Sequence, residues 1–498
     1  VQHYCVVSEW SSYNCSSSGL TYDECELSKK NASIPFNYTT DDEMTYAQCL
    51  KYNVSRVDFI PGMDPSNYTT EMLSTLPCDE GWVYDDSQYI STVVTDFDLV
   101  CERDDLNEIA QTVFYAGYLV GSLVFGALSD GIGRWWTLAL CTALRTVSSV
   151  ALAFAPNWWI FIILRFFQGM ALISCYIILF VIGTEYVGPS KRNIAGILMC
   201  IPYSLGYMFL ALVAYFVRDW RTLQLVVSVP LSCLVALMIV LPESARWLIS
   251  NGKYDHAKKI VMKIAKVNKK TAPDPLFTEE FKMEQNAARK ESKLRAIDLF
   301  RTRKVCFRTL NMVYNWMAHS LIYTGLSLNT SNLGANDYAA FAVAGAVEIP
   351  AYIIAMFTVE YFGRRPSLIV LVLLGGVSCL CTALVPAGLW LTTIAMIGKF
   401  GISGSFGIVY LYTAELYPTN IRTIAVGTCS MFSRVATMLA PFILTLDKLW
   451  APLPLVIFGS LAVIAGFLAF FLPETRGFAL PETRLEGEDI GHHTHTRL

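Results

Sequence analysis

Two charged side chains lie in the middle of long apolar stretches, where a charge is costly and is therefore usually functional or paired. Glu348 lies midway along residues 338–359, and Arg434 lies midway along residues 423–446. An arginine binds a carboxylate through two parallel hydrogen bonds, whereas a glutamate favours a cationic group. Together they could bind a small molecule that carries both signs of charge. The alternative is that Glu348 and Arg434 pair with each other or bond to neighbouring backbone.

Aromatic residues at helical spacing could complete such a site. A quaternary ammonium cannot donate hydrogen bonds and is held by ring faces, at ~0.5–2 kcal/mol for each ring. Residues four or seven positions apart can share one face of a helix. The pairs with this spacing are Tyr203/Tyr207, Phe406/Tyr410, Glu348/Tyr352, Trp316/Tyr323 and Ser430/Arg434. A single tyrosine on an apolar helix more often packs in the core or at the lipid interface, so only the whole set predicts a binding site.

Four further titratable residues lie in apolar stretches, and His319 and Arg145 are interpreted as structural. We expect His319 and Arg145 to have no binding role. Lys399 and Arg165 are placed near the starts of their helices, from which long side chains can reach the membrane surface.

Motifs of enzymes and pumps are missing from the sequence. It contains no Gly-x4-Gly-Lys-Ser/Thr phosphate loop, no His/Cys cluster with metal-ligand spacing and no convincing Ser/His/Asp set. We therefore predict that the protein is not an enzyme, has no metal or cofactor and is not driven by a nucleotide.

The elements that must position these residues are membrane-spanning helices. Hydrophobic residues make up 54% of the 498 residues and charged residues only 16%, more apolar side chain than a soluble core can bury. A helix of about 20 apolar residues crosses a bilayer. Eleven such stretches occur, at residues 108–128, 135–155, 158–187, 194–217, 222–241, 307–328, 338–359, 367–386, 391–412, 423–446 and 452–472.

The two signs of charge occupy different regions. Residues 1–106 carry 5 basic and 19 acidic side chains, and residues 246–308 carry 17 basic and 7 acidic ones. Because cytoplasmic loops are enriched in lysine and arginine, the basic segment is predicted to be cytoplasmic and residues 1–106 extracellular. The basic segment also suits anionic lipid.

Sequons and cysteines agree with an extracellular position for residues 1–106. Asn-x-Ser/Thr acceptors lie at Asn31, Asn37, Asn53 and Asn67, with Asn14 a poorer fifth. Six cysteines in the same region predict three disulfides of unknown connectivity, which fits an oxidising compartment. They are Cys5, Cys15, Cys25, Cys49, Cys78 and Cys101.

Acid and base motifs recur at an offset of 230 or 231 residues, which indicates two parallel repeats. The paired motifs are Asp130/Arg134 with Glu360/Arg364, Glu185/Arg192 with Glu415/Arg422, and Glu243/Arg246 with Glu474/Arg476. We expect them at the inner ends of the helices, where ion pairs between the two halves could close the inner side. The alternative is that these charges only set the topology.

The offset leaves residues 307–328 without a counterpart in the first half. We therefore expect a further helix before Val1, which would bring the total to twelve. The alternative is an eleven-span protein with a removed signal peptide.

Several motifs resemble the organic cation/anion/zwitterion transporter family of the major facilitator superfamily. They are the run Cys78–Cys101, Leu128-Ser-Asp-Gly-Ile-Gly-Arg134, Pro242-Glu-Ser-Ala-Arg-Trp-Leu248 and Ala414-Glu-Leu-Tyr-Pro-Thr-Asn-Ile-Arg422. The resemblance covers nearly the whole chain, and Gly325–Leu333 with Val347–Tyr352 look closest to the carnitine-transporter branches. The sequence differs from the superfamily pattern at Asp130–Trp136, which has fewer basic residues.

The resemblance implies an architecture and a set of site residues. The fold would be an all-α major facilitator fold of two six-helix repeats, with a large glycosylated loop after the first helix. The position of Arg434 would be acidic in typical cation transporters and arginine in anion and zwitterion carriers. The position of Tyr352 would be lysine in some anion carriers. The positions expected to line the cleft are Tyr203, Trp316, Phe406, Tyr410, Ser430 and Arg434.

These observations predict five regions. They are an extracellular cysteine-rich domain (1–106), an N-terminal bundle (107–245), a cytoplasmic helical loop (246–306), a C-terminal bundle (307–473) and a cytoplasmic tail (474–498). Within the loop, residues 254–267 have the spacing of an amphipathic helix.

The predicted function is secondary transport of small organic ions in the plasma membrane by alternating access, most plausibly of zwitterions such as carnitine or betaines. An organic anion exchanger and a polyspecific organic cation transporter are the alternatives, and the duplication disfavours a receptor. The sequence does not indicate whether sodium or protons are coupled. Thr496-Arg497-Leu498 fits a PDZ-binding C-terminus, and no nucleic-acid partner is expected.

Overall fold

The computed structural model describes residues 3–7, 21–38, 44–54, 74–188, 199–233, 241–270, 276–283, 299–330, 336–386 and 388–477. Contacts divide the chain into two compact units. The N-terminal unit comprises Val1–Ile109 with Arg218–Thr222, and the helical bundle comprises Ala110–Val217 with Leu223–Leu498.

The N-terminal unit is built from short elements joined by disulfides. Its antiparallel strand pairs are β1 (His3–Cys5) with β6 (Trp82–Tyr84), β2 (Phe36–Tyr38) with β3 (Met44–Tyr46), and β4 (Leu50–Tyr52) with β5 (Thr75–Pro77). Helix α1 (Tyr22–Ser33) begins with a capping box formed by Thr21 and Glu24. Because so small a unit buries little apolar surface, covalent links contribute much of its stability.

Two of the predicted disulfides have both cysteines in the described residues: Cys5–Cys78 and Cys49–Cys101. Cys25 is disulfide-bonded as well, and Cys15 lies outside the described residues. The extracellular position of this unit stays a prediction.

Residues 218–222 belong to the N-terminal unit because they contact α2 (Val93–Asp96). Arg221 Nε and Trp220 Nε1 each donate to Asp96 Oδ2 at 2.9 Å. Partial burial raises the pKa of Asp96, but the hydrogen bonds from Arg221, Trp220 and Ser91 outweigh it, so that the pKa lies below its usual value.

Each of the eleven predicted apolar stretches corresponds to a helix in the described residues. These are α3 (Asp105–Ile132), α4 (Arg134–Leu152), α5 (Trp158–Tyr186), α7 (Ile201–Phe216), α8 (Trp220–Cys233), α12 (Arg303–Leu328), α13 (Asp337–Tyr361), α14 (Arg364–Cys381), α15 (Leu389–Leu416), α16 (Thr419–Leu444) and α17 (Leu453–Ala469). Parts of the predicted stretches 194–217 and 222–241 lie outside the described residues.

Six helical segments of the described residues are long and apolar enough to cross a membrane, namely those containing α3, α5, α13, α14, α15 and α16. Helices α7 and α17 are apolar but shorter. The fold is therefore mostly helical, with six candidate spans, and the total of eleven spans stays a prediction.

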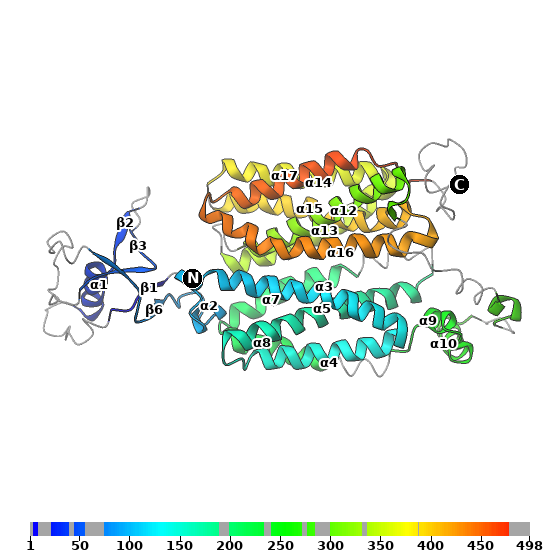
Figure 1. The fold of residues 1–498 in the computed structure, drawn as a ribbon, viewed down its shortest axis with the longest axis horizontal. Helices are drawn as coiled ribbons and strands as arrows, with labels where there is room; N and C mark the ends of the chain where they lie inside the picture. The colour runs from blue at the N-terminus through cyan, green and yellow to red at the C-terminus, as the bar shows by residue number, and fades with distance from the viewer. Residues whose placement is uncertain are drawn as a thin grey trace. The chain divides into compact units, whose positions relative to one another are not determined.

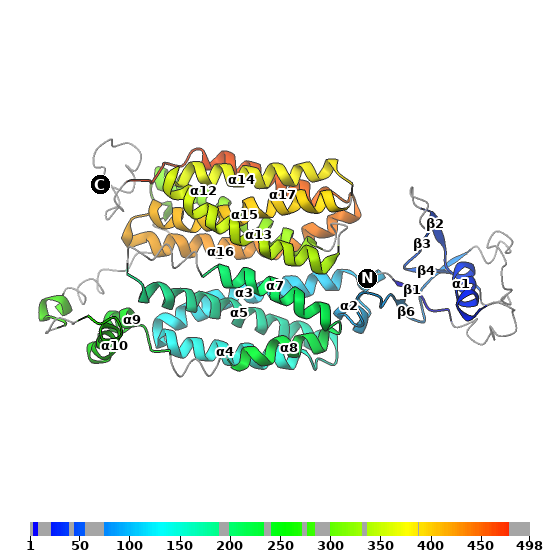
Figure 2. The same ribbon diagram turned by 180° about the vertical axis from the view of Figure 1, so that it is seen from behind.

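Within the bundle, the helices form two groups (Figures 1 and 2). Helices α12 to α17 make up the C-terminal half, and α3, α4, α5, α7 and α8 the N-terminal half. Glycines allow close crossings: a Cβ at Gly121 of α3 would lie 2.3 Å from the Met170 carbonyl oxygen of α5. Between the halves, a Cβ at Gly345 of α13 would lie 2.7 Å from Tyr207 Cβ of α7.

Two short helices lie beyond the ends of α3, α4 and α5 (Figure 1). They are α9 (Ala245–Ser250) and α10 (Tyr254–Val267), and α10 coincides with the predicted amphipathic segment. Trp247, Leu248 and Ala257 form a small buried cluster that joins them.

Candidate functional site

Glu348 is fully buried where the two halves of the bundle meet. Its Oε2 accepts a hydrogen bond of 2.8 Å from Ser204 Oγ of α7, and its Oε1 lies 3.2 Å from Lys399 Nζ of α15. Both halves thus contribute to the surroundings of this carboxylate. The hypothesis that Glu348 pairs with Arg434 is wrong, because Lys399 occupies that role.

Lys399 does not extend to the membrane surface as expected. Its side chain is only 2% exposed, and its ammonium also donates to Ser327 Oγ and, at 3.4 Å, to the Tyr323 carbonyl. It lies 3.7 Å from the centre of the Tyr323 ring. The prediction failed because α15 begins at Leu389, so Lys399 is the eleventh residue of the helix and lies far from its start. The buried charges near Glu348 therefore include a lysine that the sequence reasoning missed.

An aromatic cluster forms within the C-terminal half. Trp316 and Tyr323 of α12 meet Phe406 and Tyr410 of α15, with ring centres 4.2 Å apart for Trp316 and Tyr410 and 6.1 Å apart for Tyr323 and Phe406. Trp316 is fully buried and donates to Thr413 Oγ1, whereas Tyr410 is 37% exposed. In this conformation a ligand would contact Tyr410 and Phe406, and Trp316 would support them.

The N-terminal half contributes a second group of rings. The ring centres of Tyr203 and Tyr207 of α7 lie 5.3 Å apart. The Tyr207 ring stacks on the ring of Phe341 of α13, with 4.7 Å between their centres. Tyr203 is 47% exposed. Tyr352 lies one helical turn after Glu348, and its ring lies beside Gly407 of α15. A Cβ added at Gly407 would be 3.9 Å from Tyr352 Cδ1. Phe341 was not identified from the sequence, although it lies seven residues before Glu348.

Arg434 is half-buried on α16 and forms no ion pair with a carboxylate of the described residues. Its guanidinium lies near the Tyr410 hydroxyl, and its buried Nε has no hydrogen-bond partner among the described residues. Ser430 lies one turn earlier on the same helix and is partly buried. A carboxylate placed beside Tyr410 could therefore bind Arg434 without displacing a protein anion.

His319 and Arg165 are held by neighbouring polar groups. His319 is fully buried, with Nδ1 2.7 Å from the Asn315 carbonyl and Nε2 3.0 Å from Ser405 Oγ, which fits the expected structural role. Arg165 does not extend to the surface: it donates to Gln111 of α3 and lies 4.5 Å from the Phe114 ring centre.

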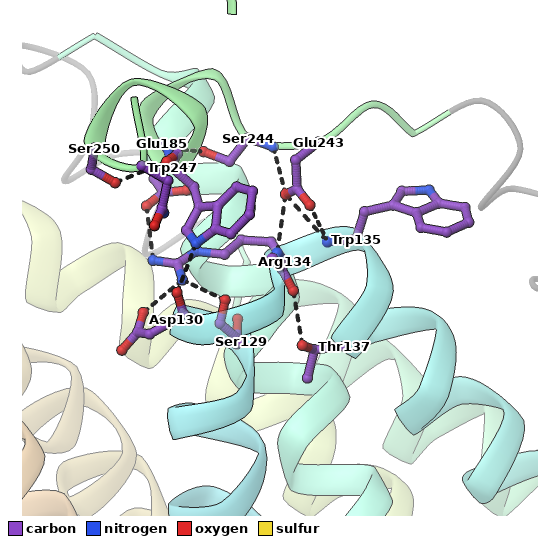
Figure 3. A network of polar contacts seen from close by, with 12 residues as sticks. Ser129, Asp130, Arg134, Trp135, Thr137, Glu185, Glu243, Ser244, Trp247 and Ser250 are labelled. Carbon is purple, nitrogen blue, oxygen red and sulfur yellow. Dashed lines mark hydrogen bonds and ion pairs between the residues drawn. The ribbon is translucent and has the colours of Figure 1, made fainter. Parts of the chain in front are cut away.

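Four predicted gate residues of the first half form one network at the ends of α3, α4 and α5, namely Asp130, Arg134, Glu185 and Glu243 (Figure 3). Arg134 pairs with Asp130 at 2.6 Å, and its NH2 lies 3.6 Å from Glu185 Oε1. The Glu243 carboxylate accepts hydrogen bonds from the backbone N–H groups of Arg134 and Trp135. These N–H groups belong to the first turn of α4, where they have no acceptor within the helix.

The second half repeats two of these three contacts. Arg364 donates to both oxygens of Glu415, at 2.8 and 2.7 Å, and Glu474 accepts from the backbone N–H groups of Arg364 and Arg365. Thr475 Oγ1 donates to Glu415 as well. The duplicated motifs thus make duplicated contacts.

The predicted partners within these motifs need correction. Glu415 pairs with Arg364 rather than with Arg422, whose Nε donates to the Tyr417 carbonyl. Arg476 donates to the Tyr361 carbonyl. In the described residues, Glu360 and Arg246 form no ion pair, Arg192 lies outside them, and the ion pairs of these motifs all lie within one half. Ion pairs between the halves that close the inner side and separate when it opens therefore stay a prediction.

Of the predicted glycosylation sites, Asn31 lies in α1, and its Oδ1 accepts a hydrogen bond from the Tyr46 hydroxyl. Asn37 lies in β2 and Asn53 directly follows β4. Asn67 lies outside the described residues. Glycosylation at these residues stays a prediction.

Comparisons with known proteins agree with this architecture. A family profile described as "Sugar (and other) transporter" matches residues 87–484. The organic cation transporter protein of Drosophila melanogaster is 38% identical over 454 residues, which cover 89% of this chain and 82% of that protein. The organic cation/carnitine transporter 2 of Homo sapiens is 37% identical over 463 residues, covering 91% of this chain and 82% of that protein.

Among solved structures, the proton:xylose symporter XylE aligns with a TM-score of 0.62 at 19% identity, covering 77% of this chain and 90% of that one. At this identity, the structural likeness shows the major facilitator fold alone.

Proposed function

Because the chain belongs to the sugar (and other) transporter family of the major facilitator superfamily, and to its organic cation and carnitine transporters, we propose that it carries small zwitterions by alternating access. It is a transporter and not an enzyme. The substrate class we propose is a carboxylate joined to a quaternary ammonium, as in carnitine and other betaines.

The observation that carries this proposal is Arg434 beside Tyr410, with no carboxylate of the described residues paired to it. The guanidinium would bind the substrate carboxylate in bidentate fashion. Phe406 and Tyr410, with Tyr203 and Tyr207 from the other half, offer ring faces to the ammonium.

Glu348 was expected to attract the cationic end of the substrate, but it is already paired with Lys399. Lys399 neutralises its charge at 3.2 Å, so the cationic end of a substrate would have to compete with Lys399 or rely on the aromatic rings. The second candidate, an organic anion exchanger, gains support from the same observation, because Arg434 and Lys399 together outnumber Glu348.

Uptake of labelled carnitine into proteoliposomes tests the proposal. Arg434→Ala should reduce carnitine uptake about 10- to 100-fold, the effect of losing a charged hydrogen-bonded contact of ~1.5–3 kcal/mol. Arg434→Lys should retain part of it. The matched control is Arg103→Ala, which removes an exposed arginine of the N-terminal unit and should change nothing.

Unchanged carnitine uptake by Arg434→Ala would exclude the zwitterion proposal. Faster uptake of simple organic anions than of carnitine by the unsubstituted protein would favour the exchanger instead. Uptake with and without sodium and pH gradients identifies the coupling ion.

For the cell, we propose the plasma membrane, with residues 1–106 outside and residues 474–498 inside. Thr496–Leu498 would bind a PDZ domain in the cytoplasm.

A further inference from the structure

Two arginines inside the N-terminal half have no carboxylate partner among the described residues. Arg145 of α4 was expected to be structural, but it is half-buried and forms no hydrogen bond or ion pair there. Arg165 of α5 is half-buried too. Its hydrogen bonds in the described residues go to the neutral side chains of Gln111 and Gln168, and its buried Nε has no partner. Charges inside the helices of a membrane protein are normally paired, so both guanidinium groups lack a counter-charge.

The sequence around these arginines supplies almost no acid. Within residues 109–184 the only acidic residue is Asp130, which pairs with Arg134 at the end of α3. The stretches 189–198 and 234–240, which lie outside the described residues, contain neither Asp nor Glu. The interior of this half therefore contains two positive charges and no carboxylate to neutralise them.

Helix α3 brings a hydroxyl group to both arginines. Tyr118 lies near the guanidinium groups of Arg145 and Arg165. It follows Gly117, where an added Cβ would lie 2.9 Å from the Met170 backbone nitrogen of α5. Because α3 and α5 approach so closely at this point, Tyr118 is held little more than one helical turn deeper along α5 than Arg165.

Contacts between α4 and α5 place Arg145 at a similar depth. Gln168 Nε2 donates to Ser149 Oγ at 3.1 Å, and Thr142 Oγ1 lies 3.8 Å from Cys175 Sγ. Thr142, Arg145 and Ser149 share one face of α4, because they are spaced by three and four residues. Arg145 therefore faces the part of α5 between the two contacts, which is the level at which α3 presents its tyrosine.

Two guanidinium groups near one hydroxyl repel each other, and the repulsion is strongest where little water separates them. An anion between them turns this repulsion into attraction, and a tyrosine hydroxyl can donate a third hydrogen bond to it. We propose that Arg145, Arg165 and Tyr118 bind a small anion, either free chloride or the carboxylate of an organic anion. This anion site lies in the N-terminal half, and neither of its arginines belongs to the proposed zwitterion site, whose carboxylate is bound by Arg434.

Binding of radioactive chloride to the purified full chain in detergent tests the anion site without any transport assay. Equilibrium dialysis, with gluconate as the balancing anion, should show one saturable site. Arg145→Gln should weaken chloride binding about 10- to 100-fold, the effect of losing one charged hydrogen-bonded contact. Because Arg145 has no hydrogen bond or ion pair in the described residues, this variant removes no such contact from the fold.

Unfolding temperatures give a second measurement on the same variant. In chloride, Arg145→Gln should lower the unfolding temperature, because a ligand that binds the folded state stabilises it. In gluconate buffer of equal ionic strength, Arg145→Gln should raise the unfolding temperature, because it then only removes a buried charge without a partner. A raised unfolding temperature in both buffers would overturn the proposal, since Arg145 would then hold no anion.

Two control variants separate the anion site from the substrate site. Arg434→Gln should lose carnitine uptake and keep chloride binding, and Arg103→Gln, at an exposed position of the N-terminal unit, should change neither. Equal losses of chloride binding in Arg434→Gln and Arg145→Gln would overturn a separate anion site.

Competition identifies the source of the anion. Displacement of the bound chloride by acetate at lower concentrations than by bromide would assign the site to carboxylates, and the reverse order would assign it to halides; both orders agree with the proposal. Unsubstituted protein that binds no chloride, and that neither acetate nor chloride stabilises against unfolding, would overturn it.

Discussion

Glu348 and Lys399 are 51 positions apart in the chain and lie on different helices. Neither side chain has more than 2% of its surface exposed. Two charges so far from water are tolerated because each compensates the other and because Ser204 and Ser327 supply further hydrogen bonds. Arg434, by contrast, retains a buried Nε with no hydrogen-bond partner in the described residues. The pair is thus a stability element, and Arg434 is the better candidate for contact with a substrate.

Glu348→Gln should destabilise the protein by about 3–5 kcal/mol, because it leaves the Lys399 ammonium buried without its counter-charge. The double variant Glu348→Gln/Lys399→Met should recover most of the loss, since both charges are then absent. Thermal unfolding of the purified protein measures both. If the single variant unfolds at the temperature of the unsubstituted protein, Lys399 does not depend on Glu348.

At the scale of the elements, the junctions before α4 and α14 are two copies of one design. Gly133 and Gly363 both have positive φ, at 116° and 103°, and the carboxylates of Glu243 and Glu474 lie against them. A Cβ would come within 2.4 Å of Glu243 Oε2 at the first junction and within 2.8 Å of Glu474 Oε2 at the second. Glycine is needed there for both backbone conformation and space.

Gly133→Ala should therefore lower the free energy of unfolding by about 1–3 kcal/mol, the cost of a strained backbone conformation. The matched control is Gly126→Ala within α3, where an added Cβ meets nothing within 4 Å and alanine favours the helix. The control should be neutral or stabilising. Equal unfolding temperatures for the two variants would contradict the role given to Gly133.

At the scale of the whole bundle, the ion pairs at the helix ends stabilise each half separately. Contacts between the halves include the Ser204–Glu348 hydrogen bond and a weaker one of 3.4 Å from Thr112 Oγ1 to the Met438 carbonyl. Halves joined by few polar contacts among the described residues suit rocking about a central site.

The two networks should differ in strength. Arg364 binds Glu415 through two bonds of 2.7–2.8 Å, whereas Arg134 and Glu185 are 3.6 Å apart. Glu415→Gln should therefore lower the free energy of unfolding by about 2–3 kcal/mol and Glu185→Gln by less than about 1 kcal/mol. Unfolding temperatures compare the two directly; a larger loss for Glu185→Gln would contradict this ranking.

The sequence by itself determined the helices, the duplication and the family. Apolar stretches of the right length form helices wherever they occur, so each predicted stretch corresponds to one, and the resemblance drawn from Cys78–Cys101 and the later motifs is confirmed by the relatives. Only the tertiary structure decided the partners. Lys399 finds Glu348, and Glu415 finds Arg364 rather than Arg422, because a buried charge selects the nearest opposite charge in space. The distance between two charges on different helices depends on how the helices cross. The spacing of residues along one helix carries no information on that crossing.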